Sequence, residues 1–310
     1  MNVVERAMTA PDQILSSDFA AFLSAASVEI SSHGQQLPSL QDNFDRGTDV
    51  TITFLPGDNY RRNVETASAL RRAGYNPVPH IAAREMPSRE ALDDFLKRAR
   101  GEADVTRILV IAGDVAAAKG PYKSSLDVCH SGLIEAHGLK SVSIAGHPEG
   151  HPFFTPQNAF KSLASWRDWG GQAGIRVEVI TQFCFESAPI LQWIGELESQ
   201  AGGVPVIVGL AGPATPATLM KFALRCGIGN SMRSLRGQIG RFGRLLTDTG
   251  PDDVIRGLQS APETSKASIA GFHLFPFGGL HKAGVWRRSQ IQQAPRLQER
   301  AAPVGDSQNP

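Results

Sequence analysis

The stretch Val177–Glu186, V-E-V-I-T-Q-F-C-F-E, begins with β-branched and apolar residues and carries a polar pair, Thr181 and Gln182, towards its end. A near-continuous hydrophobic run of this length is typical of a strand buried on both faces, as in a parallel sheet. The polar pair stands at the carboxyl end, where α/β proteins bind their ligands. The stretch therefore predicts a buried parallel strand that presents a glutamine to a flat, polar, heterocyclic ligand.

Similar strand-like runs recur along the whole chain and alternate with helical patterns. The eight predicted strands are Ser27–Ile30, Asp49–Phe54, Val78–Ala82, Arg107–Ala112, Ser141–Ala145, Val177–Phe183, Val204–Leu210 and Gly271–Phe275. The predicted helices are Leu37–Arg46, Tyr60–Ala73, Arg89–Arg100, Ser124–His137, Gln157–Gln172, Ala188–Gln200 and a segment that begins at Pro216. This alternation indicates an α/β protein with a parallel sheet.

Eight strands alternating with helices over about 260 residues match the (β/α)8 TIM barrel in number and size. A doubly wound open sheet is the alternative, but its G-x-G-x-x-G motif does not follow the first strand. We expect one barrel domain over residues 1–286, with an N-terminal helix at Pro11–Ser24 and extra helices within Ile228–Leu258, before the last strand. The polar, proline-broken residues 287–310 predict a disordered tail.

The composition is that of an ordinary globular protein, with 41% hydrophobic and 20% charged residues in a chain of 310. The formal net charge is only +1, which argues against a nucleic-acid partner or a polybasic membrane surface. Three widely spaced cysteines, Cys129, Cys184 and Cys226, form neither a disulfide framework nor a zinc pattern. With no signal peptide and no membrane-spanning run in the sequence, we expect a cytoplasmic protein.

Two carboxylates stand at predicted strand ends. Glu29 lies between Val28 and Ile30 in a strand that should be buried, where an unpaired acid has a raised pKa and suits general acid catalysis. Asp114 ends the run I-A-G-D, where it either caps the next helix or is a buried carboxylate beside a cofactor ring. The residues alone leave both roles of Asp114 open.

Three histidines and two phenylalanines also fall at these ends. His80 alone is more typical of a packed histidine, and Phe183 and Phe185 are core residues or border a planar ligand. The run His147-Pro-Glu-Gly-His151-Pro predicts a rigid loop, and we expect no metal site there, because neither a cysteine nor a third carboxylate is nearby in sequence. Motifs for serine hydrolases, zinc proteases and phosphate loops are absent from the sequence.

Five motifs occur in chain order, each at a different predicted strand. They are V-E at Val28-Glu29, P-H-I-A at Pro79–Ala82, I-A-G-D at Ile111–Asp114, H-P-E-G-H-P at His147–Pro152 and I-T-Q-F-C-F at Ile180–Phe185. In this order they resemble the motifs F-E, P-H-L-T, L-R-G-D, Y-P-E-x-H-P and I-T-Q-F-F-F of the methylenetetrahydrofolate reductase family. The resemblance covers about residues 25–280 and implies a flavin-dependent (β/α)8 barrel.

The resemblance implies that FAD lies over the barrel mouth, is reduced by NAD(P)H or another reductant, and exchanges hydride with a tetrahydrofolate derivative. It makes Glu29 the acid that protonates the folate, and Asp114 a group that tunes the flavin and the pterin. Gln182 and Phe185 are its implied substrate contacts. The implied FAD contacts are Thr53, His80, Ile111, Ala112, Gly113, Asp114, His147 and His151.

The chain departs from the family at its last predicted strand, F-H-L-F-P-F-G-G at Phe272–Gly279, which lacks the arginine that would bind the folate tail. Lys282 and Arg287 are the alternative cations. The same chemistry also runs in the methyl-oxidising direction of one-carbon catabolism. Two other hypotheses are a flavin-free pterin-binding methyltransferase and a non-catalytic partner subunit. Homo-oligomers are common among such barrels.

Overall fold

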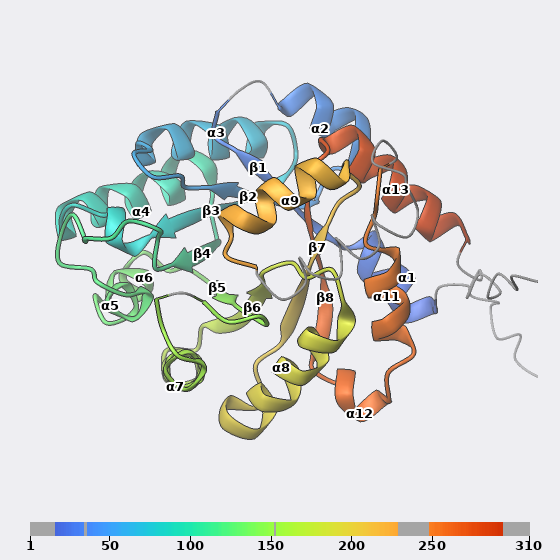
Figure 1. Cartoon of the computed structure of the whole chain (residues 1–310). Helices are drawn as coiled ribbons and strands as arrows, with labels where there is room; N and C mark the ends of the chain where they lie inside the picture. The colour runs from blue at the N-terminus through green and yellow to red at the C-terminus, as the bar shows by residue number, and fades with distance from the viewer. Residues whose placement is uncertain (1–15, 34–35, 152, 229–247, 294–310) are drawn as a thin grey trace, which may run out of the picture.

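The computed structural model describes residues 16–33, 36–151, 153–228 and 248–293 of the chain (Figure 1). Eight strands alternate with helices along these residues. The strands are β1 (Ser27–Ser31), β2 (Asp49–Thr53), β3 (Asn76–Ala82), β4 (Arg107–Ile111), β5 (Ser141–Gly146), β6 (Arg176–Thr181), β7 (Val206–Ala211) and β8 (Ile269–Phe275).

The described helices surround these strands (Figure 1). They are α1 (Ser17–Ser24), α2 (Leu37–Asn43), α3 (Tyr60–Arg72), the 3₁₀ helix η1 (Ala83–Glu85), α4 (Arg89–Ala103), α5 (Ser125–Cys129), α6 (Leu133–Ala136), α7 (Pro156–Ala173), α8 (Ser187–Ala201), α9 (Pro216–Arg225), α11 (Asp252–Gln259), α12 (Glu263–Lys266) and α13 (Leu280–Gln293).

The strands form one closed, all-parallel barrel. Each strand pairs with the next in the sequence, and β8 pairs with β1 through Ser27 opposite His273 and Val28 opposite Leu274. The prediction of a (β/α)8 TIM barrel is therefore confirmed. Because all strands run the same way, their carboxyl ends and the loops that follow them meet at one mouth.

The helices pack on the barrel through apolar stripes. In α4, Leu92, Phe95, Leu96 and Ala99 are all fully buried. Ser88 begins this helix, since its side chain accepts a hydrogen bond from the backbone N–H of Ala91. Burying such a stripe against the sheet supplies most of the stability that holds an outer helix in place.

Contacts between strands that are not neighbours identify the side chains inside the barrel. At its amino-terminal end, Arg107 of β4 bonds to Asp49 of β2 at 2.5 Å and lies 3.6 Å from Glu178 of β6. The next layer is apolar and joins Val78, Leu109 and Ile180. Polar side chains return towards the carboxyl ends, so the barrel interior has an apolar layer between two polar ones.

Two expectations about the helices need correction. Ser124–His137 is not one helix, because Gly132 takes a left-handed conformation (φ 70°) between α5 and α6. The tail does not begin at Arg287, because α13 continues to Gln293. Arg287 is buried, and its guanidinium donates hydrogen bonds to the carbonyl oxygens of Leu23 and Ser24. Helix α13 therefore continues past residue 286.

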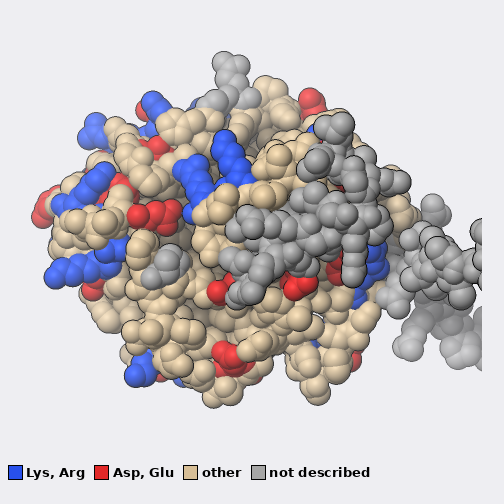
Figure 2. Space-filling view, in the orientation of Figure 1, with Lys and Arg blue, Asp and Glu red and all other residues tan. Residues whose placement is uncertain are grey.

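Parts of other expectations fall outside the described residues, namely residues 1–15, 229–247 and 294–310. Within the described part, α1 occupies the end of the predicted N-terminal helix, and α11 and α12 are extra helices before β8. Acidic and basic side chains are interspersed on the face seen in Figure 2. None of the described helices combines the length and the apolar character needed to cross a bilayer.

Candidate functional site

Glu29 and His80 define the floor of the barrel mouth. They belong to β1 and β3, which are not neighbours, and their side chains approach to 3.7 Å between Glu29 Oε2 and His80 Nε2 inside the barrel. Burial raises the pKa of Glu29 to about 8 and lowers the pKa of His80 to about 3. At neutral pH the pair is therefore an uncharged acid facing an uncharged imidazole.

Several buried polar atoms around this pair have no partner within the described residues. They are Thr51 Oγ1, Thr53 Oγ1, His80 Nε2 and His273 Nε2. His273 is held by Ser27, whose Oγ lies 2.8 Å from its Nδ1. Burying a polar atom without a hydrogen bond costs free energy, and such atoms concentrate where a ligand or ordered water binds. The floor thus offers unused hydrogen-bonding capacity.

Gln182 follows β6 at the rim of the mouth. Its backbone N–H donates to Gly146 O at 2.7 Å, and its side-chain Oε1 accepts a hydrogen bond from Phe183 N–H at 3.2 Å. The thiol of Cys226, the residue after α9, lies beside this amide. The pKa of Cys226 is raised to about 11, mainly by burial and in smaller part by the nearby carboxyl groups of Glu29 and Asp114. Gln182, Glu29 and Asp114 belong to three different strands or the loops after them, and all three lie close enough to Cys226 to influence its pKa.

Cys226 itself was not predicted as a site residue. It lies in the segment from Pro216 whose pattern indicates only a helix, and its neighbours in sequence carry no motif. Its place at the mouth depends on how α9 crosses the barrel end after β7 (Figure 1). No signal in the sequence identifies this residue.

The I-A-G-D turn is held next to the mouth by β3 and η1. Gly113 has φ +91°, and a Cβ there would lie 3.3 Å from the Ala82 side chain, so only glycine suits this turn. Arg84 N–H donates to Ala112 O at 2.9 Å. Asp114 is exposed, which corrects the expectation of a buried carboxylate, because the turn carries it out of the barrel. Ile111 points inward and packs on the apolar layer.

Phenylalanine rings form a wall on the β6, β8 and α9 side of the mouth. Phe222 and Phe277 stack with their centroids 4.1 Å apart, and Phe183 meets Phe277 edge-on at 4.8 Å. Phe183 is fully buried and Phe185 half-buried, with 5.6 Å between their centroids. Several of these rings remain partly exposed, so the wall suits a flat apolar or aromatic ligand face.

Gly209 of β7 makes room for this wall. A Cβ at Gly209 would lie 2.6 Å from the ring of Phe275 and 2.2 Å from Thr181 O. Its N–H donates to Thr181 Oγ1 at 2.9 Å. The absence of a side chain thus lets an aromatic ring of β8 enter the barrel mouth.

His147 and His151 lie in the loop after β5, apart from the floor. Their ring centroids are 4.8 Å apart, and His151 stacks on Phe154 at 4.3 Å. Burial lowers the pKa of His147 to about 4, with a further contribution from His151, and burial also lowers the pKa of His151. Both imidazoles are therefore neutral at physiological pH.

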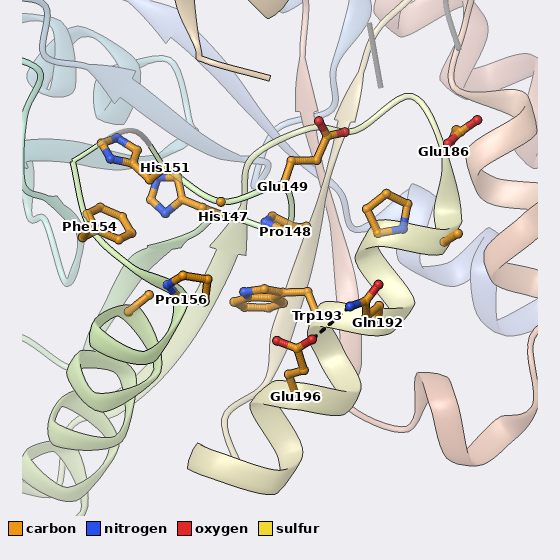
Figure 3. Close-up of a pocket in the computed structure, with 14 residues that line it drawn as sticks. His147, Pro148, Glu149, His151, Phe154, Pro156, Glu186, Gln192, Trp193 and Glu196 are labelled. Atoms are coloured by element: carbon orange, nitrogen blue, oxygen red, sulfur yellow. Dashed lines mark hydrogen bonds between the residues drawn. The ribbon is translucent and has the colours of Figure 1, made fainter. Parts of the chain in front are cut away.

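These two histidines border a cavity of about 410 Å³ that lies between this loop and the first turns of α7 and α8 (Figure 3). Glu149, Glu186 and Glu196 contribute carboxylates to its lining, and Trp193 contributes an indole ring. Among the described residues, no group of three or more histidine, cysteine, aspartate or glutamate side chains is arranged to hold a metal ion.

The structure brings most of the predicted site residues to one end of the barrel but separates them into two groups. Glu29, Thr53, His80 and Gln182 surround the floor and rim, whereas His147 and His151 line the lateral cavity. Arg287 is excluded as a ligand-binding cation by its burial beside α1. Lys282 pairs with Asp248 at 2.8 Å.

Comparison with known proteins adds little to this description. No family model matches the chain. Among solved structures, tryptophan synthase from M. tuberculosis is similar with a TM-score of 0.44 and 12% identity over 89% of this chain and 95% of that one. The tryptophan synthase A-subunit of Pyrococcus furiosus gives 0.43 and 10% over 87% and 97%. Dihydropyrimidinase from Brevibacillus agri gives 0.35 and 10% over 62% and 41%. These likenesses are too low to support an argument about activity.

Proposed function

We propose that this protein is a flavin-dependent oxidoreductase that interconverts 5,10-methylenetetrahydrofolate and 5-methyltetrahydrofolate. The observation that carries the proposal is Glu29, a carboxyl group on the floor of the barrel mouth whose pKa is raised to about 8 by burial. Such a group keeps its proton at neutral pH and can donate it to a substrate nitrogen. Opening the five-membered ring of the methylene form requires that proton.

The residues that surround Glu29 fit the ring system of FAD. Thr53 Oγ1 and His80 Nε2 are buried without partners, and the resemblance makes both residues flavin contacts. Hydrogen-bond acceptors and donors on a flavin ring are suitable partners for such groups. Bound FAD would supply the hydride chemistry, which amino-acid side chains do not provide.

The negatively charged part of FAD needs a cation. Arg84 touches the I-A-G-D turn, since its backbone N–H donates to Ala112 O. Its guanidinium Nη2 donates to Ala116 O at 2.9 Å, and its buried Nε has no partner in the described residues. The lateral cavity is less suitable for phosphates, because its described lining carries three carboxylates and neither lysine nor arginine. Arg84 is therefore the residue that we assign to the diphosphate side.

Gln182 and the phenylalanine wall would orient the pterin. An amide provides both a donor and an acceptor, which matches the edge of a pterin ring, while half-exposed rings cover a flat face. Their position beside Glu29 would hold the substrate nitrogen over the acid and exclude water from it. Asp114, within electrostatic reach of Cys226 and His151, would add negative charge near the flavin.

The experiment that tests the proposal is an absorbance spectrum of the purified protein between 300 and 550 nm, wavelengths that cover the flavin bands. The spectrum is recorded before and after anaerobic addition of 5-methyltetrahydrofolate. Flavin bands that bleach are the expected result. A colourless protein that FAD does not reconstitute would reject the proposal and favour the methyltransferase or the partner-subunit hypothesis.

A matched pair of variants separates the roles. Glu29→Gln should abolish the reaction with folate but leave flavin reduction by NAD(P)H near normal, since only the folate step needs the proton. Gln182→Ala should weaken folate binding more than FAD binding. Loss of both half-reactions in Glu29→Gln, with FAD still bound, would contradict the role assigned to Glu29.

A further inference from the structure

The loop after β8 carries no cation. Its residues Pro276–Gly279 are P-F-G-G, and Gly278 lies so close to Pro213 O that a Cβ there would collide with it. Farther along the chain, Lys282 is held in an ion pair, and the guanidinium of Arg287 is bonded to backbone carbonyl groups of α1. These two cations are therefore engaged elsewhere, and the negative tail of a folate needs a different partner.

Helix α9 lines the same side of the barrel mouth. Its Phe222 ring stacks on Phe277 of the β8 loop, with 4.1 Å between the centroids and 19° between the ring planes, and it keeps part of its surface exposed. One turn later, Cys226 lies beside Gln182, the residue that we assign to the pterin. The flank of α9 that carries Phe222 and Cys226 therefore borders the mouth.

Arg225 stands on this flank. Residues three apart on a helix are neighbours on its surface, so Arg225 lies next to Phe222, and it directly precedes Cys226. Arg225 is exposed, and within the part of the chain that the structure describes its guanidinium forms neither a hydrogen bond nor an ion pair. A guanidinium presents its N–H donors in one plane, which matches the two oxygens of a carboxylate. Arg225 is thus an available cation at the edge of the phenylalanine wall.

We propose that Arg225 binds a carboxylate of the glutamate tail of the folate and so makes the protein selective for pterins that carry an acidic tail. The inference rests on the folate reaction proposed above and names the residue that selects its substrate. With the pterin beside Gln182, the tail would pass the half-exposed rings of the wall and leave the mouth at the end of α9. The rings alone would accept a neutral tail equally well, so the charge selectivity is what Arg225 adds.

Binding of 4-aminobenzoyl-glutamate to the full-length protein, followed by saturation-transfer NMR, tests the proposal. This probe carries the aryl ring and the glutamate but no pterin, and its diamide, in which amides replace both carboxylates, is the neutral isostere. The acid should bind about fivefold or more tightly than the diamide, and added salt should weaken its binding. Equal affinities, no binding of the acid at millimolar concentration, or displacement of the acid by an equimolar amount of inorganic phosphate would overturn the proposal.

Two variants at opposite ends of the barrel locate the probe. Arg225→Gln should lower the affinity for the acid about three- to tenfold and leave the affinity for the diamide unchanged. Lys140→Gln is the control, because the exposed Lys140 directly precedes β5 at the amino-terminal end of the barrel, and loss of the same charge there should change neither affinity. An equal effect of both variants on the acid would mean that the probe responds to net charge alone, which would overturn the proposal.

Kinetic measurements separate this inference from the reaction on which it rests. With 5-methyltetrahydrofolate, Arg225→Gln should raise KM about three- to tenfold and leave kcat nearly unchanged, since the tail lies away from the reacting atoms. With a tail-less 5-methyltetrahydropterin, the variant and the wild type should have equal KM, and an equal rise with both substrates would contradict the role of Arg225. A flavin that neither methyl donor bleaches rejects the proposed reaction, whereas the acid and its diamide, which need neither flavin nor pterin, still report on Arg225.

Discussion

Glu29 and His80 face each other across the inside of the barrel, with 3.7 Å between Glu29 Oε2 and His80 Nε2, and neither forms a charged pair with the other. Burial acts on them in opposite directions, because it raises the pKa of a carboxyl group and lowers that of an imidazole. At neutral pH the proton is therefore bound to Glu29, and His80 is uncharged. This relationship gives the two residues opposite effects on stability as the pH changes.

Glu29→Gln should stabilise the fold most at alkaline pH. The folded-state pKa of Glu29, about 8, lies above its ordinary value of 4.5, so its stabilising protonated form is fully present below pH 4.5 and is lost as the pH rises through about 8. The glutamine variant does not pay this cost. We compare the free energy of unfolding of the variant with that of the wild type at both pH values. The difference should be about 2–4 kcal/mol more in favour of the variant near pH 8 than near pH 4.5. Urea unfolding at the two pH values measures it, and equal differences would contradict the raised pKa.

His80→Asn should make the protein less sensitive to acid. The folded-state pKa of His80, about 3, lies below its ordinary value of 6.5. Between these pH values the unfolded chain binds a proton at His80 and the folded chain does not, so the free energy of unfolding decreases as the pH falls from 6.5 towards 3. Asparagine has no such proton. The variant should show a smaller drop in melting temperature over this range than the wild type. His130→Asn is the control, since His130 is exposed, and it should behave as the wild type does.

Gly209→Ala should destabilise the barrel mouth. The new Cβ would lie 2.2 Å from Thr181 O and 2.6 Å from the Phe275 ring, and the backbone oxygen has little freedom to move. We expect a loss of about 1–3 kcal/mol, measured by thermal or urea unfolding. Gly171→Ala in α7 is the matched control, because a Cβ there meets nothing within 4 Å and alanine favours a helix. A neutral Gly209→Ala would mean that the Phe275 ring is not held in the mouth.

Glu85→Gln should loosen the segment that carries Asp114. The buried Glu85 carboxylate forms an ion pair with Lys119, whose N–H also donates to Arg84 O at 2.8 Å. Removing one partner of a buried pair costs about 3–5 kcal/mol at most, and less here because Lys119 is half exposed.

Hydrogen exchange measures the effect, and we expect faster exchange in residues 112–119 of Glu85→Gln than in the wild type. The control is Glu102→Gln, which breaks the exposed pair of Glu102 with Arg98 on α4 and should change little. Unchanged exchange around Asp114 in Glu85→Gln would show that the hydrogen bonds of Arg84 suffice to hold this segment.

The sequence predicted the barrel well where local patterns decide the structure. The predicted helix Arg89–Arg100 appears as the first part of α4, because burial of one helix face and the capping of its first turn depend on residues close in sequence. The break between α5 and α6 was missed, since Gly132 within an otherwise helical pattern does not reveal a left-handed conformation. Arg287 was assigned to a polar tail, although α13 buries it against two backbone carbonyl groups of α1.

The sequence by itself determined the eight alternating strands and helices, and hence that Glu29, His80 and Gln182 stand in or directly after strands of a barrel, because strand periodicity and polarity are local properties. Only the tertiary structure decided which of these groups meet. Closure of the barrel brings Glu29 to within 3.7 Å of His80 across an intervening strand. It also brings Cys226 to Gln182, and it sets His147 and His151 apart beside α8. Distances between side chains on different strands depend on register and closure, which no single stretch of sequence contains.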